Sequence, residues 1–465
     1  MAEAKLYGQN KGGMSINGII KDYYAYAGEN VSAGDLVEYV NGIASKTDYG
    51  ESVDTQLSAL SNSAANSISA VALDDSRVFI THGGIDGVNK LGAMVCTIEG
   101  ATITCGTDTT LSNAAGSGRK MSVAKLNENK VFIAYSGSAS VSDRLNGIVC
   151  TIDRTTISAG ESLELGPNYS SNSVSAVALD DSRVFIAYCY NSKYYIDAKI
   201  CSIDGTTITL GTTTELSQSY YTGSVISACL LSNGNVFIAH SIGSNYYLYG
   251  IVCSISGTTI TAGNDTEISI ITNSGYVISA VALDENRIFI AHSRHTDCYL
   301  YGIVVGVNGT TITLGSDTAI EVNYYEGKVI SVCLLPDGNV FIAHSKESNY
   351  SLFGIVVNID GTTITCGTDA QINIETNAGY AISSLLLNNG TIFIAHSNGA
   401  SCYLHAQIFG IDYENNLPTN HIIATEYETQ VRKVTTGQFD GIAKTSGTGG
   451  DDTGHKDIVS IWTLE

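Results

Sequence analysis

The sequence predicts an all-β protein, namely a seven-bladed β-propeller built from four-stranded antiparallel blades. Three observations support this: an apolar phrase repeats seven times, each copy contains four strand-like runs, and a stray copy of the last run precedes the first repeat. The phrase is Val/Ile-Phe-Ile, centred on Phe79, Phe132, Phe185, Phe237, Phe289, Phe341 and Phe393, at intervals of 53, 53, 52, 52, 52 and 52 residues. Such a period is typical of propeller blades or solenoid turns.

Four β-rich runs make up each copy, and we call them strands A to D. In the fourth copy they cover residues 225–231, 236–241, 246–255 and 258–269, and polar turns rich in Gly, Asn, Asp and Ser separate them. None of the runs has the 3.6-residue period of an amphipathic helix. Four antiparallel strands per repeat is the content of one propeller blade.

Closure of the ring is predicted from a misplaced strand D. Residues 54–58 match the strand-D ending at residues 108–112, whereas the seventh copy has no such ending after Ile411. We therefore expect the N-terminal piece to complete blade seven, which would remove two exposed sheet edges. An open solenoid would need polar capping repeats, but the first and last copies keep the same apolar runs.

The charge of the chain excludes two classes of partner. Among 465 residues there are 23 basic and 45 acidic side chains, a net charge of −22. Such a surface repels nucleic acid and anionic membranes, so we expect neither as a partner. The N-terminus lacks the basic and apolar regions of a secretory signal, and no apolar run is long enough to span a membrane.

The eleven cysteines are predicted to be buried, reduced thiols of a protein made in a cytosol. Cys229 and Cys333 stand where another copy has Val281, so cysteine exchanges with a small apolar residue. No Cys-x-x-C pair occurs, which argues against a zinc site. We expect no metal and no cofactor.

A column of polar residues follows the Val/Ile-Phe-Ile phrase. Its members are His82, Tyr135, Tyr188, His240, His292, His344 and His396. Equivalent positions in successive blades lie on a circle, whereas metal ligands must converge on one ion. We therefore expect a structural ring in which each side chain is hydrogen-bonded towards a neighbouring blade. The acidic A–B turns, such as Asp74-Asp75 and Asp180-Asp181, are read as turn chemistry, with weak cation binding as the alternative.

Tyrosine is concentrated in the B–C and D–A connections. Because strands alternate in direction, these two kinds of connection emerge at the same end of each blade, and we call this end the tyrosine rim. The candidate ligand-binding residues on it are Tyr194, Tyr195, Tyr220, Tyr221, Tyr246, Tyr247, Tyr299, Tyr324, Tyr325, Tyr350 and Tyr403. Tyrosine offers a large contact area and a hydroxyl at low entropic cost, which suits sugars. The alternative is that tyrosine is simply a good strand residue.

The two ends of the chain lie outside the repeats. We expect residues 1–51 and 413–465 to form the two halves of a small, discontinuous β anchor module, with the propeller, residues 52–412, inserted between them. The phrases A-G-D-L-V-E-Y-V and F-D-G-I-A-K-T-S-G-T-G-G in these ends resemble β-modules of tailed-phage tail fibres and capsid-decoration proteins. The repeat phrase L-Y-G-I-V-C-x-I-x-G-T-T-I-T is similar to tail-fibre proteins of clostridial prophages.

The resemblance implies a non-enzymatic virion protein of a phage or prophage of a Gram-positive host, made in the host cytoplasm and located on the virion. We expect the terminal module to contact other virion proteins, with homo-oligomers on the particle. The propeller is expected to attach to a host cell-surface glycan or S-layer. Two alternatives stay open: a capsid decoration protein on the phage head, and a glycan-degrading enzyme, which would require a carboxylate pair in a pocket.

Overall fold

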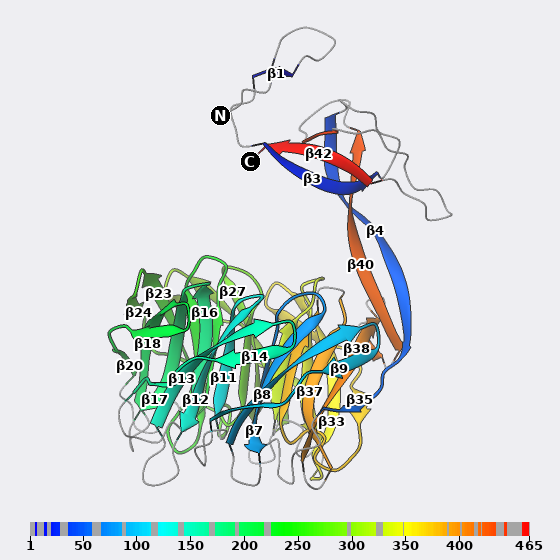
Figure 1. Ribbon diagram of the computed structural model, residues 1–465. Helices are drawn as coiled ribbons and strands as arrows, with labels where there is room; N and C mark the ends of the chain where they lie inside the picture. The colour runs from blue at the N-terminus through cyan, green and yellow to red at the C-terminus, as the bar shows by residue number, and fades with distance from the viewer. Residues whose placement is uncertain are drawn as a thin grey trace. The chain divides into compact units, whose positions relative to one another are not determined.

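The computed structural model contains strands and no helix in the residues it describes. These residues are 5–6, 14–15, 20–27, 36–57, 67–85, 90–112, 120–137, 144–166, 173–190, 195–217, 225–294, 299–321, 329–346, 348–387, 390–399, 402–412, 417–419, 421–433, 441–443 and 458–464. Seven similar antiparallel sheets form the blades of a propeller (Figure 1). The fold class predicted from the repeat is confirmed.

The first three blades show the common plan, with each strand listed in the order A, B, C and the two parts of D. Blade one comprises β6 (Ile68–Ala72), β7 (Arg77–Ile85), β8 (Lys90–Glu99), β9 (Thr102–Cys105) and β10 (Thr109–Ser112). Blade two comprises β11 (Met121–Asn127), β12 (Lys130–Gly137), β13 (Arg144–Asp153), β14 (Thr156–Ala159) and β15 (Leu163–Glu164). Blade three comprises β16 (Val174–Asp180), β17 (Arg183–Tyr190), β18 (Tyr195–Asp204), β19 (Thr207–Leu210) and β20 (Thr214–Ser217). Both parts of strand D pair with strand C, so strand D is one edge strand with a break.

The remaining blades repeat this plan. Blade four comprises β21 (Ile226–Leu230), β22 (Val236–Ile242), β23 (Tyr247–Ser256), β24 (Thr259–Ala262) and β25 (Thr266–Ser269). Blade five comprises β26 (Ile278–Ala282), β27 (Arg287–Arg294), β28 (Tyr299–Asn308), β29 (Thr311–Leu314) and β30 (Thr318–Glu321). Blade six comprises β31 (Ile330–Leu334), β32 (Val340–Lys346), β33 (Ser351–Asp360), β34 (Thr363–Cys366) and β35 (Ala370–Asn373). Blade seven contains β36 (Ile382–Leu386), β37 (Ile392–Asn398) and β38 (Tyr403–Asp412) as strands A to C.

The repeated phenylalanine is the centre of the packing between blades. Phe237 is fully buried and shares a core cluster with Ile288 and Ile290 of the next blade. Its ring lies over Gly250 of strand C, where a Cβ atom would come within 3.1 Å of the ring. Four blades have glycine at this place and three have alanine, namely Ala93, Ala198 and Ala406, so the phenylalanine leaves room only for a small residue.

A ring of serines joins the innermost strands. Each strand A carries a serine whose Oγ accepts a hydrogen bond from a backbone N–H of the next strand A, at 2.9–3.2 Å. The serines are Ser69, Ser122, Ser175, Ser227, Ser279, Ser331 and Ser383. Ser383 of blade seven accepts from Ala70 of blade one, so the ring is closed. Closure rules out the solenoid alternative.

The predicted N-terminal clasp is also confirmed. Strand β5 (Thr55–Gln56) pairs antiparallel with β38, and the N–H of Leu57 donates to the carbonyl of Leu404 at 2.9 Å. The N-terminal segment thus supplies the second part of strand D in blade seven.

The first part of strand D in blade seven comes from the other end of the chain. Strand β39 (Leu417–Thr419) pairs with the end of β38, with Pro418 opposite Ile411. We expected these residues in the C-terminal half of the anchor module, so the propeller extends further than the sequence suggested. A proline is tolerated here because strand D is an edge strand.

Chain ends from both sides build a second unit. Strands β3 (Ile20–Ala27), β40 (His421–Lys433), β4 (Leu36–Glu51), β41 (Gly441–Ala443) and β42 (Ile458–Leu464) form a closed barrel, and β1 (Lys5–Leu6) pairs with β2 (Met14–Ser15) (Figure 1). The chain divides into one unit of residues 1–47 and 424–465 and a second unit of residues 48–423. No helix in the described part of the chain has the length and apolar character needed to cross a membrane.

The cysteines depart from the prediction at one place. Cys96 of β8 and Cys105 of β9 lie directly opposite each other and form a disulfide. The expectation that all cysteines are reduced is therefore wrong for this pair. Of the eight free cysteines in the described residues, six are buried as expected, whereas Cys229 and Cys366 are partly exposed. Desolvation raises the pKa of Cys229 and of Cys333 to about 12, which keeps both thiols protonated.

The acidic A–B turns follow turn chemistry. In each turn the first acidic side chain accepts a hydrogen bond from the backbone N–H two residues later, as Asp74 does from Ser76 at 3.0 Å and Asp180 from Ser182 at 2.9 Å. This is an Asx turn. No cluster of three or more His, Cys, Asp or Glu side chains placed to hold a metal ion occurs among the residues described.

Candidate functional site

In blade four, the B–C loop and the D–A connection are locked together by their backbones. The N–H of Asn273 donates to the carbonyl of Asn245 at 2.7 Å, and the N–H of Gly275 donates to the carbonyl of Tyr246 at 2.5 Å. The rings of Tyr246 and Tyr276 meet edge to face, with centroids 5.3 Å apart. Tyr276 is 44% exposed. We call Tyr246 and Tyr276 the blade-four tyrosine pair.

Blade six repeats this arrangement. Asn377 donates its N–H to the carbonyl of Asn349 at 2.7 Å, and Gly379 donates to the carbonyl of Tyr350 at 2.6 Å. The rings of Tyr350 and Tyr380 have centroids 5.3 Å apart, and Tyr380 is 40% exposed. We call Tyr350 and Tyr380 the blade-six tyrosine pair.

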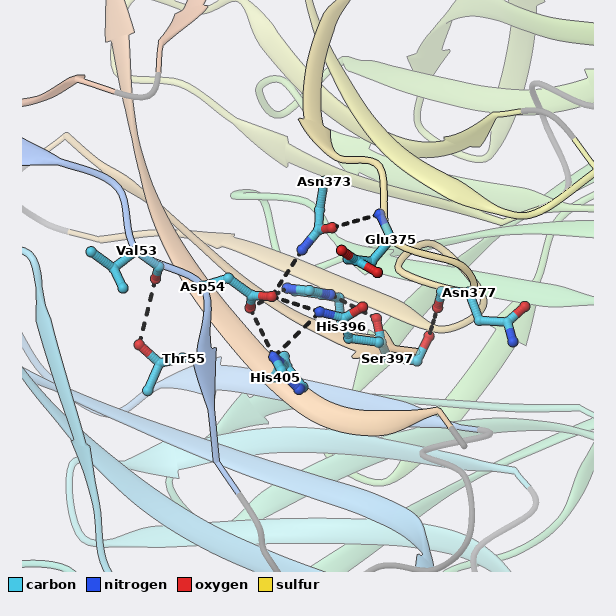
Figure 2. Close-up of polar contacts among 10 residues, drawn as sticks. Val53, Asp54, Thr55, Asn373, Glu375, Asn377, His396, Ser397 and His405 are labelled. Atoms are coloured by element: carbon cyan, nitrogen blue, oxygen red, sulfur yellow. Dashed lines mark hydrogen bonds and ion pairs between the residues drawn. The ribbon is translucent and has the colours of Figure 1, made fainter. Parts of the chain in front are cut away.

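The D–A connections are also fixed to the next blade. Ser397 of β37 donates its hydroxyl to the carbonyl of Asn377 at 2.6 Å (Figure 2). Ser293 of β27 makes the same contact with Asn273 at 3.1 Å. Each tyrosine pair is thus presented by a connection that is hydrogen-bonded on both sides, and little conformational freedom is left for a ligand to remove.

The backbone of the two B–C loops is unusual. Tyr246 and Tyr350 have φ values of +50° and +57°, in the left-handed region that residues with a Cβ atom rarely adopt. Such conformations cost free energy and are found preferentially at ligand-binding and switch regions. Cys402 at the equivalent position of blade seven has the same conformation, with a φ value of +49°, so this geometry belongs to the repeated loop and does not depend on a tyrosine.

The structure brings some predicted tyrosines together and leaves others apart. Tyr246 and Tyr350 each pair with a tyrosine of the D–A connection, whereas Tyr195, Tyr247, Tyr299 and Tyr403 are half-buried at the first position of strand C in their blades. Tyr194, Tyr220, Tyr221, Tyr324 and Tyr325 lie outside the described residues.

Sequence reasoning missed Tyr276 and Tyr380, which are the exposed members of the two pairs. A signal for them exists, because both end the phrase Thr-Asn-Ser/Ala-Gly-Tyr in a D–A connection.

The histidine column forms pairs within the blade. Each histidine Nε2 lies near an aspartate at the break in strand D of its own blade: His82–Asp108 at 3.1 Å, His240–Asp265, His292–Asp317 and His344–Asp369 at 3.0 Å, and His396–Asp54 at 3.3 Å. Where blade two has Tyr135 instead, its hydroxyl contacts Ser162 at 2.6 Å. We expected partners in a neighbouring blade, so this detail of the prediction is wrong.

In blade seven the aspartate comes from the N-terminal clasp. One oxygen of Asp54 accepts hydrogen bonds from the amides of Asn373 at 2.9 Å and Asn398 at 2.6 Å, and the other lies 3.0 Å from Nδ1 of His405 (Figure 2). Burial acts to raise the pKa of Asp54, but the contacts with His396 and His405 outweigh it and lower this pKa far below its usual range. The clasp is therefore held by a charged, well-bonded side chain.

Blade three contains two buried charged side chains on strand C, Asp197 and Lys199. Asp197 is 9% and Lys199 is 4% exposed, and Nζ of Lys199 donates to the carbonyl of Leu165 in blade two. Burial, reinforced by the charge of Glu215, raises the pKa of Asp197 to about 6, although Lys199 opposes the shift. This group is a source of pH-dependent stability.

Comparison with known proteins shows the fold. A crystal structure of a protein from Lactobacillus plantarum matches with a TM-score of 0.53 at 13% identity, over 77% of this chain and 99% of that one. AofleA from Arthrobotrys oligospora matches with a TM-score of 0.44 at 10% identity, over 68% of this chain and 88% of that one. The Aleuria aurantia lectin bound to Fucα1-6GlcNAc matches with a TM-score of 0.41 at 14% identity, over 68% of this chain and 97% of that one.

No protein-family model matches the sequence, and no curated protein matches it. At 13% identity the Lactobacillus plantarum structure supports the fold alone, and the two weaker matches add no argument about the ligand. The chain is accordingly similar in architecture to other β-propellers.

Proposed function

We propose that the chain is a non-enzymatic recognition protein whose propeller binds carbohydrate through the tyrosine rim. The observation that carries the proposal is the presentation of a tyrosine pair by two mutually bonded connections, once in blade four and once in blade six. A planar phenol ring offers a stacking surface to the apolar face of a sugar, and nearby Asn, Ser and Thr side chains offer hydrogen bonds to its hydroxyls.

The tyrosine rim resembles a binding surface in the rigidity of its loops as well as in its composition. Recognition residues are commonly found on loops held by a rigid scaffold. Here the scaffold is the closed propeller, and the loops are pinned to each other and to the following blade. Because the loops are already ordered, binding loses little free energy to their ordering.

We further propose that this recognition takes place on a phage particle. The terminal phrases resemble virion modules, and the chain ends that carry them form a unit of their own, residues 1–47 and 424–465. In this proposal the barrel contacts other virion proteins, and the propeller attaches the tail to a glycan or S-layer of a Gram-positive host. Homo-oligomers on the particle would multiply the number of contacts with the host surface.

The experiment compares adsorption of purified variants to isolated host cell wall. Replacing Tyr246 and Tyr247 with alanine removes ring area from one rim loop, and we expect at least tenfold weaker adsorption with little change in melting temperature. The matched control, Asn233→Ala with Asn235→Ala, alters an A–B turn at the opposite end of the same blade and should adsorb as the native protein does. Equal adsorption of both variants and the native protein contradicts the proposal.

Two further measurements separate the alternatives. Release of reducing sugar ends from the cell wall would indicate a glycan-degrading enzyme and overturn the non-enzymatic assignment. Densitometry of purified virions distinguishes the location, because tens of copies per particle indicate the tail and hundreds indicate a decorated head.

A further inference from the structure

The two tyrosine pairs are copies of one design with a single blade between them. Tyr246 and Tyr350 are 104 residues apart, and so are Tyr276 and Tyr380. The intervening blade carries Cys298 at the position of Tyr246 and Tyr350. The design therefore occurs in blades four and six, although the propeller scaffold recurs in every blade.

The copies agree in backbone as well as in side chains. Besides the left-handed tyrosines, Asn273 and Asn377 have φ values of +63° and +62°. The ring centroids are 5.3 Å apart in both pairs. The interplanar angles are 82° and 66°, so the two surfaces are similar in shape and can accept the same class of ligand.

The charge of the two surfaces restricts the ligand. The blade-four connections, residues 243–246 and 270–276, contain no charged side chain. The blade-six D–A connection adds one exposed carboxylate, Glu375. Its B–C connection contains Lys346 and Glu347 in the sequence, and the ammonium of Lys346 lies 2.9 Å from Asp369. With a net charge of −22 on the whole chain, the protein repels polyanions.

We propose that the blade-four and blade-six tyrosine pairs are two equivalent subsites for a neutral glycan, and that a polysaccharide chain occupies both at once. This inference rests on the proposed function and adds to it the number of subsites, their position and the class of ligand. Neutral hexose or N-acetylhexosamine polymers fit these subsites, whereas phosphate-bearing wall polymers such as teichoic acids do not.

Occupation of two subsites by one polymer changes the affinity without any new contact. Once one subsite is filled, the second binding step is intramolecular, and such linkage commonly strengthens binding by 10²–10⁴-fold. The closed propeller fixes the separation between the subsites, so the gain depends on a polymer long enough to span one blade. Short oligosaccharides bind each subsite independently.

The test begins with an array that carries neutral oligosaccharides and polyglycerol phosphate. The tightest neutral oligosaccharide is then titrated calorimetrically into the full chain, and we expect two equivalent sites per chain. Tyr276→Ala and Tyr380→Ala should each reduce the stoichiometry from two to one, and the double variant should show no measurable binding. Both side chains are at least 40% exposed, so neither change is expected to unfold the protein.

The polymer of the same sugar tests the bivalent step. Each single variant should bind the polymer at least 100-fold more weakly than the native chain does. Leu314→Ala is the matched control, since Leu314 is a 50% exposed apolar side chain on β29 of blade five and belongs to neither pair. It should keep two sites and the full affinity for the polymer.

The outcomes separate the inference from the proposed function. No binding to any glycan on the array overturns both. One site per chain, or a stoichiometry that is unchanged in Tyr276→Ala and Tyr380→Ala, overturns the two-subsite inference while glycan recognition stands. Binding to polyglycerol phosphate in preference to neutral sugars overturns the assignment of the ligand class.

Discussion

The clasp of blade seven gives the sharpest prediction. Asp54→Ala removes the acceptor of three hydrogen bonds, from Asn373, Asn398 and His405, at distances of 2.6–3.0 Å. A hydrogen bond to a charged group contributes about 1.5 kcal/mol at the low end of the measured range, and the side chain of Asp54 is 23% exposed. We therefore expect the free energy of unfolding to fall by about 3–4 kcal/mol.

The assay combines a thermal melt with limited proteolysis. A loss of this size should lower the melting temperature by roughly 6–8 °C, at about 2 °C per kcal/mol for a large domain. Because β5 pairs with β38 through two residues only, the variant should also expose the segment around residues 48–57 to protease. Cleavage sites there are identified by mass spectrometry.

Asp265→Ala is the matched control in blade four. Its carboxylate contacts His240 at 3.0 Å and accepts a hydrogen bond from Ser217 at 2.8 Å. Unlike Asp54, however, Asp265 belongs to the same stretch of chain as the other strands of its blade. This variant should melt lower than the native protein without exposing the N-terminal segment. If Asp54→Ala melts no lower than Asp265→Ala and residues 48–57 stay protected, the carboxylate does not hold the clasp.

The pH dependence of the clasp follows from the direction of the shift. The pKa of Asp54 is lowered in the folded protein, so its contribution is fully present above the unfolded value of about 3.9. It is lost as the pH falls below that value. The difference in melting temperature between the native protein and Asp54→Ala should therefore be larger at pH 5 than at pH 3.

Three more predictions follow from the described contacts. His240→Tyr should lose about 2 kcal/mol in chemical denaturation because its phenol faces Asp265, and adding Asp265→Ser should restore at least half; a fully tolerated single variant would contradict the pairing. Reductant should lower the melting temperature of the native protein but not that of Cys105→Ala, whose disulfide to Cys96 is already absent; equal responses would count against the bond. Asp197→Asn should raise the free energy of unfolding at pH 7 by about 1–2 kcal/mol. In the native protein this free energy should decrease as the pH rises from 4 to 6, because the folded protein there binds one more proton than the unfolded chain, and the variant should show a smaller decrease. An unchanged pH dependence would show that Asp197 is not its source.

Much of the fold could be read from the sequence because its repeat is tied to packing. Phe237 must lie over Gly250 and between two blades, so its spacing cannot drift. The clasp was readable for a similar reason, since Asp54 and Thr55 repeat the residues of a strand D. Strand β39 could not be predicted from the sequence, because its backbone pairing with the edge of β38 requires no particular side chains.

The site was harder to predict, because its features depend on pairs of positions. The aspartates that contact the histidine column are replaced by Ser162 in blade two, where Tyr135 replaces the histidine. This pairing is visible only when both positions are compared, and not from the histidines alone. The disulfide is similar, since blade one is where both facing positions are cysteine. The left-handed backbone of Tyr246 leaves no mark in the identity of the residue.

Blade seven has a mechanical role that the other blades do not share. Both connections between the barrel unit and the propeller unit run through its strand D, by way of β5 and β39. Any force transmitted along the chain between the two units therefore reaches the propeller through the two short pairings that β5 and β39 make with β38 of blade seven.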